Sequence, residues 1–156
     1  MNMGTVRVGN WLVEVDAVTT SRAQAARPTG GPESCDCLHC RNFVAARTAV
    51  YPVAFTELLT TLGVPIDRES EICHCGEAAP GRHFYFGWFH FVGELKEGPD
   101  CLHDNGSIEL QELSSGFSIG FTRRLGLVPE TFTTSRIVQL EFSAEAPWLL
   151  SEPYAD

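Results

Sequence analysis

Residues Cys35 to Cys40 read CDCLHC, so three of the chain's six cysteines and one of its five histidines fall within six positions. Cysteine thiolates bind zinc and other soft metal ions, and a pair of thiols can also act as a redox dithiol. A second group, Cys73, His74 and Cys75, follows in the stretch ICHCG. These two stretches carry the clearest chemistry that the sequence offers.

The first interpretation of the two stretches is a zinc site. Zn²⁺ takes four ligands at tetrahedral angles, and a short C-x-x-C turn presents two sulfurs to one point. The candidate ligands are Cys35, Cys37, Cys40, Cys73 and Cys75. On an extended strand, however, a C-x-C pair holds its side chains about 7 Å apart. A turn, which Gly76 would permit, is therefore needed to bring the second pair to one ion.

The second interpretation treats Cys37 and Cys40 as the redox dithiol of a thiol enzyme or sensor. If Asp36 caps the following helix, Cys37 lies in its first turn, where free backbone N–H groups favour a thiolate, and Cys40 follows as the resolving partner. Two features weigh against this interpretation. The segment before Cys35 is RPTGGPES rather than a buried strand, and the Asp36 carboxylate disfavours a neighbouring thiolate. Free thiols without either role are the third alternative.

The residues around the cluster predict a loop followed by two helices. The run TTSRAQAARPTGGPES, at about 19–34, is rich in small and polar residues and predicts a flexible loop. Apolar residues then recur with helical spacing from Phe43 to Val50. Asp36 is placed to cap this helix, and Pro52 ends it because proline lacks the N–H that the helix requires. A second helix begins at Pro52, with its apolar face formed by Phe55, Leu58, Leu59 and Leu62.

Alternating apolar residues predict strands in the rest of the chain. They occupy 6–18, 83–95, 116–121 and 136–142. Apolar residues fall on both faces of the segment from His83, which predicts a central strand covered on both sides. The order of these elements predicts an α+β domain, an antiparallel sheet with a helix pair packed on one face. A single domain over 1–156 is expected, since 156 residues with 44% hydrophobic composition suffice for one core.

The charge balance of the chain limits its partners. Eleven basic residues against twenty acidic ones give a net charge of -9, which repels both a phosphate backbone and an anionic membrane. Nucleic acid and membrane are therefore excluded as expected partners. The N-terminus lacks the pattern of a secretion signal, and no run of about 18 apolar residues occurs, so a cytoplasmic location is expected. In that compartment free thiols and metal ligands are commoner than disulfides.

The other polar residues are interpreted as structural. His90 is expected to be a histidine of the sheet satisfied by a hydrogen bond, and Asp100, His103 and Asp104 are expected in a turn. Because no nucleophile elbow, phosphate loop or H-E-x-x-H motif occurs, no catalytic residue is predicted and a non-enzymatic binding or accessory domain is favoured. An aromatic belt leaves small-molecule binding open as well. It consists of Tyr85, Phe86, Trp88 and Phe89.

Several motifs together resemble a family of small uncharacterised bacterial proteins. They are CDCLHCRNF from Cys35, YP at Tyr51, L-x-x-L-G ending at Gly63, YFGWFHFVG from Tyr85, VPE at Val128, LEF at Leu140 and APW at Ala146. The resemblance implies no activity, substrate or ligand, but it implies that the first cysteine cluster is shared. ICHCG departs from the family pattern. That departure shifts weight to a role for Cys35, Cys37 and Cys40 near Asn42, Tyr85 and Trp88.

Overall fold

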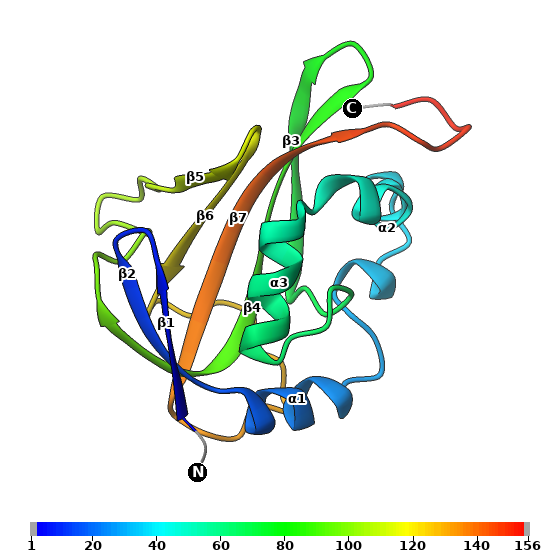
Figure 1. Ribbon diagram of the computed structural model, residues 1–156. Helices are drawn as coiled ribbons and strands as arrows, with labels where there is room; N and C mark the ends of the chain where they lie inside the picture. Colours follow the sequence, from blue (N-terminus) through cyan, green and yellow to red (C-terminus); the bar gives the residue numbers. More distant parts are fainter. Residues whose placement is uncertain (1–2, 155–156) are drawn as a thin grey trace.

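The computed structural model describes residues 3–154, which form a twisted antiparallel sheet with helices on one side (Figure 1). The strands are β1 (Met3–Val8), β2 (Trp11–Asp16), β3 (Glu71–Ala79), β4 (Arg82–Glu97), β5 (Gln111–Ser114), β6 (Phe117–Thr122) and β7 (Ile137–Pro147). The helices are α1 (Ala17–Ala25), α2 (Leu38–Val50) and α3 (Val53–Leu62), with a 3₁₀ turn at Pro32–Ser34. The predicted fold class is confirmed. No helix in the described residues is long and apolar enough to cross a membrane.

Strand β4 lies at the centre of the sheet, whose order is β1-β2-β4-β7-β6-β5. One edge of β4 pairs with β7 along most of its length. The other edge is shared, because β3 pairs with β4 as far as Trp88 and β2 pairs with it from Gly93 onward. A side chain at Gly93 would meet the carbonyl oxygen of Glu14 at 2.0 Å, so glycine is required where β2 approaches. The prediction of a central strand is confirmed.

Helices α2 and α3 pack on the same face of the sheet, as Figure 1 shows, and their apolar stripes meet aromatic residues of β4. The ring centroid of Phe43 in α2 lies 5.2 Å from that of Tyr85, and the ring of Phe55 in α3 lies 5.8 Å from Phe89. Each such ring contributes about 1.5–3 kcal/mol by leaving water. Helix α3 ends at Gly63, whose φ of 80° is left-handed. Both predicted helices are therefore confirmed.

The segment predicted as a flexible loop begins instead as helix α1. Asp16 caps this helix, because its carboxylate accepts a hydrogen bond of 3.0 Å from the N–H of Thr19. The buried side chain of Gln24 donates a hydrogen bond of 3.0 Å to the carbonyl of His90 on β4. The loop prediction was wrong here, since small residues such as Ala23 let the helix pack closely on the sheet. Composition alone does not reveal that tertiary contact.

The opposite face of β4 is covered mainly by loops, with α1 packed only at its Val92 end through Ala23. His90 is fully buried there, and its Nδ1 lies 2.6 Å from the hydroxyl of Ser70 while its Nε2 lies 2.8 Å from Oε1 of Gln139. The expectation of a hydrogen-bonded sheet histidine is confirmed. Trp88 faces the same side and donates its indole N–H to the carbonyl of Gly126 at 2.9 Å. The sheet therefore separates a helix face from a loop face.

A buried ion pair joins α2 to the segments on either side of it. Arg47 donates to Glu69 from Nε at 2.9 Å and from Nη2 at 2.7 Å, and its Nη1 lies 2.8 Å from Glu33. The hydroxyl of Tyr51 also donates to Glu69, which is fully buried. Burial raises the pKa of Glu69. Burial opposes the charge of Arg47, but the hydrogen bonds that it donates to the two carboxylates raise its pKa, so the pair is held together as ions.

Removal of this ion pair should destabilise the fold. The Arg47→Met variant leaves Glu69 buried without a cation, so we expect a loss of about 3–5 kcal/mol in the free energy of unfolding, measured by urea denaturation. Arg41→Met on the same helix is the matched control. Arg41 pairs with Glu152 where both side chains are close to half exposed, and such a pair contributes about 0–1 kcal/mol. Equal losses in the two variants would contradict this account.

Candidate metal centre

The sulfur atoms of Cys35, Cys37 and Cys40 lie within 4.8 Å of one another. Cys40 is buried, Cys35 is partly buried and Cys37 is exposed. Within residues 3–154, the metal-binding side chains that gather closely enough to hold one ion in a group of three or more are these three cysteines. Sulfurs bound to a tetrahedral zinc are about 3.8 Å apart. The cluster would therefore contract by about 1 Å at most to hold zinc.

The capping geometry of α2 brings two of these sulfurs together. Cys37 is the N-cap residue, with an extended backbone (φ -69°, ψ 156°), and its sulfur accepts the N–H of Cys40 at 3.4 Å. A side chain at the N-cap normally accepts from the residue three positions on, so C-x-x-C spacing places the two side chains side by side. The prediction of Asp36 as the cap was wrong by one residue, because a sulfur occupies the position that a carboxylate usually takes.

The cysteines of the cluster differ in their tendency to ionise. Burial opposes the ionisation of Cys37, but hydrogen bonds from the Cys40 N–H and from the thiols of Cys35 and Cys40 lower its pKa. Burial raises the pKa of Cys40, and the neighbouring sulfurs raise it further. The thiolate is the form that attacks disulfides and binds metal. Of Cys37 and Cys40, Cys37 is therefore the readier for either reaction.

Hydrogen bonds to β4 and to the chain after β7 hold the first turn of α2 in place. The hydroxyl of Tyr85 donates to the carbonyl of His39 at 2.8 Å and accepts from Nδ2 of Asn42 at 3.3 Å. Burial raises the pKa of Tyr85 to about 12, so the hydroxyl keeps its proton as a donor. Asn42 is fully buried and also accepts the N–H of Leu149 at 2.7 Å. Asn42 and Tyr85 thus support the cluster, whereas Trp88 lies on the loop face.

The structure does not bring Cys73 and Cys75 into the cluster. Both lie on β3, which is extended, and both are exposed. Cys73 pairs with Phe86 on β4 and points with it to the loop face, whereas His74 pairs with Tyr85 and points to the helix face. Alternation along β3 therefore separates Cys73 from the head of α2. Three of the five predicted ligands meet, and a metal-binding role for the other two stays a prediction.

ICHCG instead contributes its histidine to the side of the sheet that carries α2. The ring of His74 stacks on the ring of His39, with centroids 4.0 Å apart and planes within 3°. Its Nε2 lies 2.9 Å from Nδ1 of His83, which is fully buried on β4. Sequence spacing alone does not predict this row of three imidazoles, because two of them come from different strands and meet α2 only through the sheet register.

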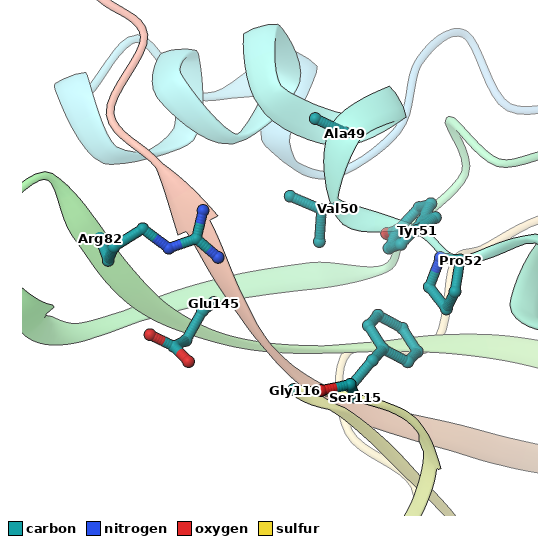
Figure 2. Close-up of a pocket in the computed structure, with 9 residues that line it drawn as sticks. Ala49, Val50, Tyr51, Pro52, Arg82, Ser115, Gly116 and Glu145 are labelled. Atoms are coloured by element: carbon teal, nitrogen blue, oxygen red, sulfur yellow. The ribbon is translucent and has the colours of Figure 1, made fainter.

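The cavity of about 350 Å³ shown in Figure 2 lies away from the cysteines, at the junction of α2 and α3. Tyr51 and Pro52 line one side of it, and Arg82 and Glu145 lie on β4 and β7 on the other. A basic and an acidic side chain thus share one wall of the cavity.

Comparisons of the chain with protein-family models, curated proteins and solved structures find no match. The resemblance to a family of small bacterial proteins therefore stays a prediction. The function of this protein therefore has to be inferred from the cysteine cluster itself. Three converging sulfurs, with one exposed and of lowered pKa, are the feature from which that inference starts.

The different surroundings of the cysteines predict different alkylation rates. In reduced protein freed of metal, iodoacetamide at neutral pH should modify Cys37 several-fold faster than Cys73 or Cys75, although all three are exposed. Partial desolvation raises the pKa of Cys73 and of Cys75, whereas hydrogen bonds lower that of Cys37. Peptide mass spectrometry over a time course measures the three rates. Equal rates would show that the hydrogen bonds to Cys37 do not favour its thiolate.

Proposed function

We propose that this protein is a non-enzymatic, cytoplasmic binding or accessory domain that holds one zinc ion at the head of α2 through Cys35, Cys37 and Cys40. The convergence of these three sulfurs within 4.8 Å carries the proposal. Soft thiolate ligands favour zinc over magnesium or calcium, which prefer oxygen. The resemblance to small bacterial proteins that share the CDCLHC cluster supports the same site.

The charge of the three thiolates favours a structural ion, whereas their number leaves one position open as in a catalytic site. Three thiolates more than balance the two positive charges of zinc, which weakens its ability to polarise a bound water or carbonyl. A fourth position would remain for water or for a group from a partner. Cys35 follows the 3₁₀ turn and Cys37 caps α2, so the ion would link the end of that turn to the start of the helix. Zinc binding would then add to the stability of the fold.

Metal analysis tests the zinc site. Full-length protein purified without a histidine tag and without chelator should carry about one equivalent of zinc, and Cys37→Ser or Cys40→Ser should reduce it severalfold, because two thiolates bind zinc far more weakly than three. Inductively coupled plasma mass spectrometry measures the moles of zinc per mole of protein. Less than about a tenth of an equivalent in the wild type would overturn the proposal.

Cys73→Ser with Cys75→Ser is the matched control for this experiment. Both residues are exposed cysteines on β3 outside the cluster, so the double variant removes two thiols without touching the cluster. We expect it to retain the wild-type zinc content. A loss of zinc as large as that of Cys37→Ser would instead restore Cys73 and Cys75 as ligands and would require β3 to rearrange.

The lowered pKa of Cys37 beside the buried thiol of Cys40 favours a second candidate function, thiol–disulfide exchange. The Cys37 thiolate would attack a disulfide and release one thiolate, and Cys40 would then lose its proton and attack Cys37, releasing a second thiol. The product is a Cys37–Cys40 disulfide, and the substrate disulfide is reduced to two thiols. The exchange needs only a disulfide as co-reactant.

Oxidised glutathione tests this second function. In the metal-free double variant Cys35→Ser with Cys40→Ser, the mixed disulfide with glutathione should accumulate at Cys37, because both neighbouring thiols that could resolve it are absent. The wild type should form the internal disulfide instead, and intact-protein mass spectrometry distinguishes the two products. Slow formation of mixed disulfides at Cys37 and Cys73 alike would exclude a dithiol role, and would leave the zinc site unaffected.

A further inference from the structure

The loop face of the sheet contains a pocket of about 280 Å³ with a buried carboxyl group in its lining. Its walls are mainly apolar and come from β4, from the loop that follows β4 and from the loop that follows β6. They include Phe86, Trp88, Leu102, Ile108 and Leu125. Glu141 of β7 also lines the pocket, although it is only 1% exposed. The pocket thus combines an apolar wall with one acidic group.

A chain of hydrogen bonds fixes the position of this carboxyl group. Oε1 of Gln139 accepts the N–H of Gly126 at 2.8 Å and also contacts Nε2 of His90 at 2.8 Å. Since an amide oxygen only accepts, Nε2 of His90 carries the proton, and the Nδ1 atom accepts from Ser70. The amide group of Gln139 is therefore turned so that its N–H donates to Glu141. The hydrogen bonds of Gln139 therefore fix the position of the Glu141 carboxyl group.

The surroundings of Glu141 leave its charge poorly compensated. Burial raises the pKa of Glu141 to about 7, and the hydrogen bond from Gln139 offsets only part of that effect. Arg124 also lines the pocket, but its guanidinium group is half exposed and pairs with Asp104. A buried carboxylate is stabilised by a nearby positive charge and by donated hydrogen bonds. A cationic ligand would supply both.

We propose that this pocket binds a small organic amine, with its protonated nitrogen on Glu141 and a flat apolar group against Trp88. The volume lies just below the roughly 300–1,000 Å³ typical of ligand pockets, so a ligand of one ring with a short aminoalkyl chain fits best. Trp88 and Phe86 offer aromatic surface to such a ring. This site lies on the other face of the sheet from the cysteine cluster and does not depend on the zinc proposal.

Binding of three related probes to the full-length protein tests the inference. Nuclear magnetic resonance titrations would follow the indole N–H of Trp88, assigned with Trp88→Phe among the three tryptophans. 2-Phenylethylamine should shift this signal at submillimolar concentration. 2-Phenylethanol, which keeps the ring and loses the charge, should bind roughly tenfold to a hundredfold more weakly, and phenylacetate more weakly still. Equal binding of the amine and the alcohol would overturn the role of Glu141.

Variants localise the binding. Glu141→Gln should lose most of the preference for the amine over the alcohol, whereas the control Glu57→Gln, an exposed glutamate on α3, should bind as the wild type does. Ile108→Trp places a large ring at the exposed rim of the pocket and should block every probe. If Glu141→Gln fails to fold, the proposal is still tested by the order in which the wild type binds the three probes and by the loss of their binding in Ile108→Trp. Wild-type amine binding in either Glu141→Gln or Ile108→Trp would overturn the proposal.

Discussion

The buried ion pair between Arg47 and Glu69 is the interaction on which the arrangement around the cysteines depends. Arg47 projects from the last turn of α2, and its guanidinium group holds both Glu69, just before β3, and Glu33, in the 3₁₀ turn before Cys35. A charge buried this deeply is tolerated only when its partners are fixed. The ion pair between Arg47 and Glu33 therefore fixes the segment just before Cys35 against α2. This position of the segment lets Cys35 lie close to Cys37 and Cys40.

The cysteine cluster combines a local cause with a tertiary one. The local cause is the N-cap geometry of α2, in which the sulfur of Cys37 accepts the N–H of Cys40. The tertiary cause is the anchoring of that turn by Asn42 and by Tyr85 on β4, together with the approach of Cys35. The cluster thus lies at a turn anchored by buried hydrogen bonds, which is the support that a site needs if it is to hold an ion in fixed geometry.

The sheet gives the protein two chemically different faces. The helix face carries the sulfur cluster and the row of imidazoles, whereas the loop face carries Glu141 and its hydrogen-bond network. Strand β4 contributes to both, because Tyr85 supports α2 while Trp88 lines the pocket behind it. The two proposed binding sites therefore lie on opposite faces of one strand without sharing a side chain.

Periodicity and punctuation in the sequence by themselves determined the α+β class, both helices of the pair and the central strand, because local spacing of apolar residues decides which face of each element is buried. The spacing from Cys37 to Cys40 likewise determined that two sulfurs meet at a helix start. Only the tertiary structure decided that α1 forms, since Gln24 needs a partner on β4. It also decided that Cys73 lies apart from the cluster, because the β3 register, which depends on contacts distant in sequence, turns the side chain to the loop face.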